Sequence, residues 1–391
     1  MQVKPKLLVT ASTFPRWEGD TEPRFILDLS KALLEYFDVT VLAPAYPGAK
    51  TKEVLEGVKV IRYHYFPIHK WETLCYPGAI VPRIKEKKIR ALLVPFLLGG
   101  LWWKLFRILK NYDIVHAHWI IPQGIIQSLF KKPYMLTGHG GDVLELNSGI
   151  FFALKRRALK KARRITVVSS RLKEKLETLY HIEDITIQSM GCDTSKFSPQ
   201  KRVENYFNQN EKKVILFVGR FVKIKGIEYL IKAMDGIEAK LIIVGKGPLE
   251  EALKEKAAPY GEKIMFMEAQ NHNELSVIYS SSDIFVIPSI TLPGGVTEGT
   301  PTVLIEAMAS GIPVIGTRTG GIPEIIEDGI NGYLVEERDV ALISNRIIDL
   351  INDDAKRERL SKQAQLTAEK YDYKVIGRRY KELIDKMYLL Q

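Results

Sequence analysis

The sequence contains only two cysteines, Cys75 and Cys192, among 391 residues. Two isolated cysteines provide neither a disulfide framework nor the spacing of a metal site, which is typical of a reducing compartment. The sequence also lacks an Asp-x-Asp triplet and any cluster of His, Asp and Glu with metal-ligand spacing. Because Mg²⁺ and Mn²⁺ sites need such oxygen ligands, we expect no metal and no bound cofactor.

Long apolar runs are also scarce. The longest, Ala91–Trp103, has 13 residues and is interrupted by Pro95, Gly99 and Gly100. A helix that crosses a bilayer needs about 20 apolar residues, so this run is expected to be too short. The opening residues MQVKPKLLVT have no long apolar segment of the kind found in signal peptides. We therefore expect a cytoplasmic protein.

Positive charge is concentrated in the first half of the chain. Residues 1–200 hold 31 Lys+Arg and 18 Asp+Glu, a net of +13, which leaves +11 − 13 = −2 for residues 201–391. Such asymmetry indicates an anionic partner for the first half. A basic segment, Arg83–Arg90, runs into the aromatic stretch Leu92–Trp103. This composition fits either an interfacial helix on anionic lipid or a core-packed helix with a solvated basic face. Without a recognised nucleic-acid-binding module, we expect no nucleic-acid partner.

Short β-branched runs alternate with helical patterns along the chain. Runs that are apolar on both faces are typical of parallel strands with helices on both sides of the sheet. We predict amphipathic helices at Arg24–Phe37, Arg171–Tyr180, Leu249–Lys256 and Glu274–Ser280. Strands are predicted at Leu7–Thr10, Val39–Ala43, Val58–Tyr63, Ile114–Ala117, Tyr134–Thr137, Ile165–Ser169, Ile185–Gln188, Val214–Gly219, Leu241–Gly245, Ile264–Met267, Ile284–Pro288, Pro313–Gly316 and Gly332–Val335.

The predicted fold class is α/β, with two Rossmann-like domains facing a central cleft. Ser198–Lys213 is polar, contains Pro199 and has no regular period, so it is interpreted as the linker between them. The predicted domains span residues 1–200 and 201–370. A last helix in residues 371–391 is expected to cross back to the first domain.

The strongest motif joins Glu298 and Glu306 around the start of a helix. Pro301 favours a helix that begins near Thr302 and ends before Gly311. A helix N-terminus attracts anions, and the flanking carboxylates are suited to bind hydroxyls on either side of a pyrophosphate. The alternative is a capped surface helix with two solvated glutamates.

A second motif places two cations where a predicted strand ends. Arg220 follows Gly219, and Lys225 precedes Gly226. A guanidinium and an ammonium at this edge can hold phosphate oxygens and stabilise the charge that develops on a leaving diphosphate. The alternative is a pair of exposed loop cations.

These residues resemble the retaining glycosyltransferases of family 4, which have the GT-B fold. The resemblance extends over nearly the whole chain and includes Gly320-Gly321-Ile-Pro-Glu324, Met190-Gly-Cys-Asp193 and Val115-His-Ala-His118-Trp119. It implies that the second domain binds a nucleotide-sugar donor and the first an acceptor. One departure concerns the loop after the first strand, where Asp20 replaces the second glycine of the usual pair.

The resemblance also implies roles for individual residues. Glu306 would bind the ribose, Glu298 the transferred sugar, and Arg220 and Lys225, after Gly219, the diphosphate. His139 matches a histidine beside the donor sugar and joins Arg220, Lys225 and Glu298 as a candidate catalytic residue. The sugar pocket would be lined by the backbone amides of Gly299, Thr300, Pro301, Thr302 and Val303.

The function expected from the resemblance is transfer of a hexosyl group with retention, without a metal, to a glycan, lipid or small-molecule acceptor. The acceptor could be lipid-linked or phosphorylated, and a peripheral position on the cytoplasmic face of a membrane is compatible with the basic first half. Two alternatives remain: a non-hydrolysing nucleotide-sugar epimerase of the same fold, and a non-catalytic module that binds a sugar nucleotide or a membrane.

Overall fold

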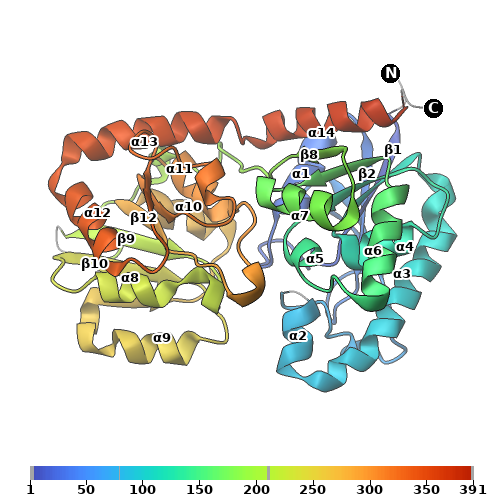
Figure 1. The fold of residues 1–391 in the computed structure, drawn as a ribbon, viewed down its shortest axis with the longest axis horizontal. Coiled ribbons are helices and arrows are strands. Elements are labelled where there is room, and N and C mark those ends of the chain that lie inside the picture. The colour runs from blue at the N-terminus through green and yellow to red at the C-terminus, as the bar shows by residue number, and fades with distance from the viewer. Residues whose placement is uncertain (1–3, 79, 209–211, 389–391) are drawn as a thin grey trace. The chain divides into compact units, whose positions relative to one another are not determined.

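The chain forms two compact units, each built around its own sheet. A computed structural model describes residues 4–78, 80–208 and 212–388. Unit 1 comprises residues 1–189 together with 374–391, and unit 2 comprises residues 190–373 (Figure 1). The passage into unit 2 after Ser189 thus precedes the domain boundary that the sequence places after residue 200.

Unit 1 contains an eight-stranded sheet in the order β3-β4-β2-β1-β5-β6-β7-β8. Except for β3, the strands pair in parallel, as in the register Leu7↔Val39 between β1 and β2. The strands are β1 (Lys6–Thr10), β2 (Asp38–Pro44), β3 (Lys52–Leu55), β4 (Val58–Tyr63), β5 (Ile114–His118), β6 (Tyr134–Gly138), β7 (Arg164–Val167) and β8 (Ile185–Ile187). The helices are α1 (Phe25–Leu33), α2 (Ile80–Glu86), α3 (Val94–Ile108), α4 (Ile125–Gln127), α5 (Gly141–Leu144), α6 (Gly149–Lys161), α7 (Ser170–Tyr180) and α14 (Tyr373–Tyr388).

Strand β3 is not among the strands that the sequence predicts. It pairs antiparallel with β4 through a two-residue turn at Glu56 and Gly57, which have φ angles of 46° and 88°. Positive φ at both central residues is the requirement of the tight turns that match strand twist. The segment KEVL is mostly exposed, so it lacks the apolar run that marks the buried parallel strands.

Unit 2 contains a six-stranded, fully parallel sheet in the order β11-β10-β9-β12-β13-β14. The order reverses between β9 and β12, where ligands bind in open sheets of this kind. The strands are β9 (Lys213–Val218), β10 (Ala239–Val244), β11 (Ile264–Met267), β12 (Ile284–Ile287), β13 (Val314–Thr317) and β14 (Tyr333–Val335). The helices are α8 (Ile227–Ala233), α9 (Glu250–Ala257), α10 (His272–Ser280), α11 (Thr302–Ala309), α12 (Val340–Asn352) and α13 (Asp354–Glu369).

Alternate residues of the unit 2 strands feed two separate cores. In β9, Val214 and Leu216 pack with residues of α10, α11 and α13, whereas Ile215 and Phe217 pack with residues of α8, α9 and α12. The sheet is therefore covered on both faces, which explains why its strands are apolar throughout. The prediction of two Rossmann-like α/β folds is confirmed.

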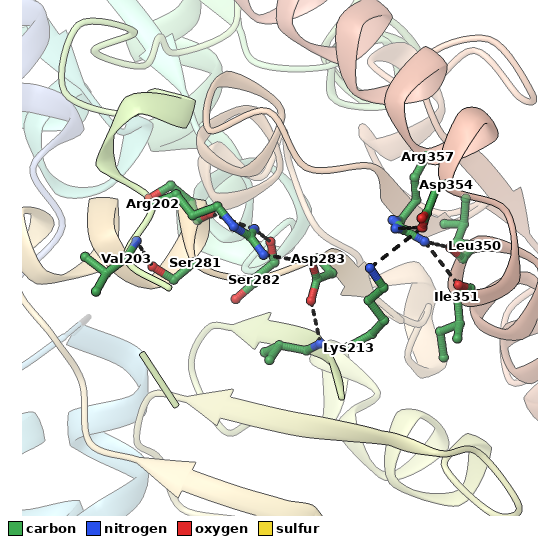
Figure 2. Close-up of polar contacts among 12 residues, drawn as sticks. Arg202, Val203, Lys213, Ser281, Ser282, Asp283, Leu350, Ile351, Asp354 and Arg357 are labelled. Carbon is green, nitrogen blue, oxygen red and sulfur yellow. Dashed lines mark hydrogen bonds and ion pairs between the residues drawn. The ribbon is translucent and has the colours of Figure 1, made fainter. Parts of the chain in front are cut away.

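The predicted linker is wrong for its first part, because residues 198–208 belong to unit 2. Figure 2 shows Arg202 and Val203 bonded to residues 281–283. The guanidinium of Arg202 donates to the carbonyls of Ser280 and Ser282 and pairs with Asp283. Phe207 is 4% exposed and lies in one of the two cores. Polar composition concealed this anchoring; residues 209–211 of the predicted linker lie outside the described residues.

Helix α14 belongs to unit 1 from Lys374 onward and packs against it with one face. Ile376, Tyr380 and Ile384 are fully buried on that face. Gly377 allows a close approach to α1, because a Cβ there would lie 2.9 Å from the Ala32 Cβ.

The expectation that the apolar run is too short to span a bilayer is wrong in terms of length. The helical segment continues beyond Ala91–Trp103 and covers Lys88–Asn111, 24 residues that include an 18-residue window with a mean hydropathy of 1.6. By length and composition alone this segment could cross a membrane, and 22% of that window is buried within the protein.

Candidate functional site

The chain that follows the carboxyl end of β9 is shaped by two glycines. Gly219 follows the strand, and a Cβ at this position would lie 3.5 Å from the Lys225 Cε and 3.1 Å from the Phe217 ring. Gly226 has φ 59°, and a Cβ there would come within 2.0 Å of the Pro288 carbonyl oxygen at the end of β12. Only glycine fits this conformation and this contact. The two glycines thus bring the chain around Lys225 against the point where the strand order reverses.

Lys225 and Glu298 form an ion pair beside this end of the strand. The Lys225 Nζ lies 2.6 Å from the Glu298 Oε1, and the two side chains are only 15% and 9% exposed. The second carboxylate oxygen, Glu298 Oε2, is buried and makes no hydrogen bond within the described part of the chain. Since a buried carboxylate oxygen without a donor is costly, this atom is suited to accept a hydrogen bond from a ligand hydroxyl.

The loop that carries Glu298 is fixed by a threonine pair and by two glycines. The hydroxyl of Thr297 lies 2.8 Å from that of Thr319. A Cβ on Gly320 would lie 2.4 Å from the Glu298 carbonyl oxygen, and Gly321 donates its N–H to the Gly299 carbonyl at 3.1 Å. Because they have no side chains, Gly320 and Gly321 let their own loop pack directly against the backbone of Glu298 and Gly299.

Helix α11 begins immediately after this loop. Its Ncap is Pro301 and its first residues are Thr302 and Val303, whose N–H groups have no acceptor inside the helix. The predicted lining by five backbone amides needs one correction, because Pro301 has no N–H and supplies only its fixed φ of −77°. Gly299 and Thr300 complete the loop between Glu298 and the helix.

Glu306 lies inside α11, is 5% exposed, and is bound by a residue that the sequence did not indicate. The hydroxyl of Tyr279, on α10, donates to the Glu306 Oε2 at 3.1 Å. Burial, followed by the charge of Glu306, raises the pKa of Tyr279 well above its usual value, so the phenol remains a donor. No sequence signal distinguishes Tyr279 from an ordinary core residue of an amphipathic helix.

Arg220 is half-buried directly after Gly219. Its guanidinium forms no hydrogen bond or ion pair with any residue that the structure describes. Of the two predicted cations, the structure therefore joins Lys225 to the predicted acid and leaves Arg220 available to an anion. A guanidinium with five donors suits phosphate oxygens.

In unit 1, the candidate residue His139 follows β6 and is held at its side chain and its backbone. Its Nε2 lies 2.9 Å from the Nδ1 of His118, at the end of β5. Its backbone N–H donates to Asp142, whose carboxylate also accepts from Gly140 N and from Ile120 N. Asp142 therefore shapes the turn after β6 and ties it to the chain after β5.

The histidines of this region remain neutral at physiological pH. Burial lowers the pKa of His139 to about 3. Burial, followed by the charge of His139, likewise lowers the pKa of His116 to about 3, and the pKa of His118 falls well below its ordinary value for similar reasons. A neutral imidazole can exchange hydrogen bonds with a hydroxyl but carries no positive charge for a leaving group.

Two family models match consecutive parts of the chain. Residues 23–196 match Glycosyltransferase Family 4, and residues 200–367 match Glycosyl transferases group 1. The chain belongs to these glycosyltransferases. It is therefore an enzyme of sugar transfer, and the family that the motifs indicate is confirmed.

Individual relatives agree with this assignment. The chain is 28% identical over 354 residues to an uncharacterized glycosyltransferase of Methanocaldococcus jannaschii, which covers 85% of this chain and 93% of the relative. The sucrose-phosphate synthase of Thermosynechococcus elongatus has the same fold, with a TM-score of 0.80 at 19% identity over 99% and 100% of the two chains. HepE of Anabaena, solved in complex with UDP-glucose, has a TM-score of 0.72 at 18% identity over 97% and 99%. The glycosyltransferase therefore has the GT-B fold.

Proposed function

We propose that this glycosyltransferase transfers a hexosyl group from a nucleotide-diphosphate sugar, with retention at the anomeric carbon. The observation that carries the proposal is the Lys225–Glu298 pair beside the N-terminus of α11. A sugar diphosphate needs cations for its phosphates and acceptors for its hydroxyls, and this edge of unit 2 presents both. The UDP-glucose complex of HepE supports a donor of this class.

In the proposed donor complex, Arg220, Lys225 and the first amides of α11 bind the diphosphate. Breaking the bond between the anomeric carbon and the diphosphate oxygen leaves negative charge on that oxygen, and fixed positive groups stabilise it without reorganisation. Glu298 Oε2 accepts a hydrogen bond from a sugar hydroxyl. Glu306, oriented by Tyr279, accepts from the ribose hydroxyls.

The acceptor hydroxyl oxygen forms its bond to the anomeric carbon on the face that the diphosphate leaves. The acceptor proton passes to the departing diphosphate, so no separate base is needed. His139, as a neutral imidazole, offers a hydrogen bond to the donor sugar. The family resemblance supports retention, and NMR of the product anomer tests it: an inverted product would refute this step.

Metal independence is part of the proposal, because the fixed cations supply the charge that a divalent ion would otherwise provide. Activity is expected to persist in excess EDTA. The acceptor class stays open among a glycan, a lipid and a small molecule. The proposed cellular location is the cytoplasm, where Cys75 and Cys192, both buried and neither in a disulfide, would stay reduced.

A donor screen followed by two reactions tests the function. Thermal shifts with UDP-, GDP- and ADP-hexoses should single out one donor, because stabilisation rises with ligand concentration over Kd. Donor that isomerises without any acceptor would indicate an epimerase. Donor binding without turnover on any acceptor would indicate a non-catalytic module. In such a protein, Arg220→Ala would have no transfer activity to remove.

A further inference from the structure

Helix α3 in unit 1 is apolar on two opposite faces, of which one is buried in the protein. Leu97, Leu101, Leu105 and Leu109 follow each other at intervals of one helical turn and are between 0% and 7% exposed. Gly100 lets this face approach the chain after β4, since a Cβ there would lie 2.9 Å from the Tyr65 Cβ. This inner face is fully used by the core of unit 1.

The outer face of α3 and the turn before it are exposed and rich in large apolar side chains. Trp103 is 53% exposed and Phe106 is 58% exposed, values far above those of core residues. A surface residue of this size is common alone, but a contiguous group marks an interaction site. We call the following group the α3 face: Ile89, Leu92, Phe96, Trp102, Trp103 and Phe106.

The aromatic rings of the α3 face are packed against one another and against neighbouring elements. Trp102 stacks on Phe106 at 5.6 Å between ring centroids and lies 6.4 Å from Phe130, just beyond α4. Phe96 contacts Phe66 edge-to-face at 4.9 Å. The rings therefore form a preorganised apolar surface, so little side-chain entropy is lost when it is covered.

Basic residues are concentrated in the segment that carries the α3 face, and most of them lack an acidic partner among the described residues. Residues 83–110 contain eight Lys+Arg and one Asp+Glu, a net of 8 − 1 = +7. Arg83 and Arg90 share the single acid, Glu86. The other cations form no ion pair with any described residue: Lys85, Lys87, Lys88, Lys104, Arg107 and Lys110. Burial, followed by the neighbouring positive charges of Lys52 and Arg107, lowers the pKa of Lys104.

We propose that the α3 face docks on an anionic lipid bilayer, with α3 lying in the plane of the membrane surface. Trp and Phe side chains bury favourably at the boundary between headgroups and acyl chains, and Lys and Arg attract anionic headgroups. An in-plane position follows because the inner leucines are already committed to the core of unit 1. A second copy of the chain is disfavoured as the occupant, because two faces with a net charge of +7 repel each other.

Flotation of the full-length protein with lipid vesicles tests the proposal. We expect binding to vesicles of phosphatidylcholine with phosphatidylglycerol, weak binding to phosphatidylcholine alone, and weakening as salt rises. The variant Trp103→Glu with Phe106→Glu should bind at least tenfold more weakly. The matched control is Ile348→Glu with Leu366→Glu, which alters two residues of unit 2 that are 40% and 52% exposed; it should bind like the unmodified protein.

A second variant, Lys85→Glu with Lys87→Glu and Lys88→Glu, tests the charge separately and should abolish the preference for anionic vesicles. The variant Trp103→Glu with Phe106→Glu, called the α3-face variant, should retain its thermal midpoint and its donor-nucleotide binding. The result therefore does not depend on the proposed transfer reaction. Three outcomes would overturn the proposal: no binding to anionic vesicles, equal binding by the α3-face variant, or protein that resists release from the membrane by alkaline carbonate. Self-association in sedimentation velocity that disappears in the α3-face variant would identify a second copy as the occupant instead.

Discussion

The Nζ of Lys225 lies 2.6 Å from the Oε1 of Glu298, although the family resemblance assigns these two side chains to different parts of a donor. One oxygen of the carboxylate is thus satisfied by the lysine, and the other is buried without a donor. The pair orients both groups before a ligand arrives. Such preorganisation reduces the entropy lost on binding.

Replacing Lys225 by Met should weaken binding of the donor nucleotide. A hydrogen bond to a charged group is worth about 1.5–3 kcal/mol, which corresponds to roughly a 10- to 150-fold rise in Kd. Isothermal titration with the nucleoside diphosphate selected by the donor screen measures this change. Lys223→Met, in the same short turn but exposed, is the control and should leave the Kd within about twofold. Equal effects of the two substitutions would contradict a specific role for Lys225.

Replacing Tyr279 by Phe removes the hydroxyl that donates to Glu306 while keeping the ring. Without it, the carboxylate is held less firmly, and we expect a loss of about 1 kcal/mol, or roughly fivefold, in nucleoside diphosphate binding. Binding of inorganic pyrophosphate should not change, because Glu306 is expected to contact the ribose. Tyr333→Phe, which removes a hydrogen bond to Asp349, is the matched control. A parallel loss for pyrophosphate would contradict the proposed role.

Gly226→Ala should disrupt unit 2 more than the matched substitution Gly236→Ala. Both glycines have positive φ, 59° and 67°, so both substitutions carry a backbone penalty of about 1–2 kcal/mol. Only at Gly226 does the new Cβ approach a backbone oxygen, that of Pro288, at 2.0 Å; nothing lies within 4 Å at Gly236. Differential scanning calorimetry should show the larger fall in midpoint for Gly226→Ala, together with a loss of nucleotide binding. Equal falls would mean that the contact with Pro288 is relieved easily.

Unit 1 should lose stability as the pH falls below about 6.5. The unfolded chain binds protons at its histidines near pH 6.5, whereas the pKa of His116 and that of His139 are lowered to about 3 in the folded unit and that of His118 lies well below its usual value. A lowered histidine pKa gives stability that is complete above the unfolded pKa and is lost on acidification. Three such groups give up to about 4 kcal/mol per pH unit.

Urea titrations followed by tryptophan fluorescence measure this slope, because all five tryptophans belong to unit 1. The useful window is pH 6.5 to 5, because carboxylates affect the stability of the unit only at lower pH. Glu56 is an example: burial alone would raise its pKa, but its contacts with Arg24 and Lys31 lower the pKa to about 2. The stability that Glu56 contributes is therefore lost only below about pH 4.5. His116→Gln should reduce the slope by about one third, and the exposed His181→Asn should not. A slope independent of His116 would show that other groups carry the pH dependence.

Much of the fold could be predicted because buried parallel strands leave a clear apolar signal. All thirteen predicted strands are present within a few residues of their expected ends, and α11 begins at Thr302 as Pro301 indicates. The strand that was missed, β3, is stabilised by a turn and by its pairing with β4 rather than by apolar content. The polar segment before β9 differs from its prediction for a similar reason: its anchoring depends on Arg202 and Phe207, whose partners are distant in the sequence.

The candidate site could be predicted only in part. Charge and spacing indicate Lys225, Glu298 and Glu306 as candidates, because anion chemistry needs these residue types beside a helix N-terminus, and the structure brings Lys225 and Glu298 together. The partners that position them could not be found in this way. Tyr279 lies 27 residues from Glu306, and His118 lies 21 residues from His139. Such pairs depend on which helix faces and strand ends meet in the tertiary structure, which local patterns do not encode.

Unit 1 is assembled from two separate segments of the polypeptide, with residues 190–373 inserted between them. The buried residues Ile376, Tyr380 and Ile384 therefore reach its core only after all of unit 2 has been synthesised. Unit 2, in contrast, is continuous in sequence and is available as a whole before α14 is made. We infer that a nascent chain completes unit 2 before unit 1. Truncation before Lys374 would leave exposed the apolar surface of unit 1 that α14 covers.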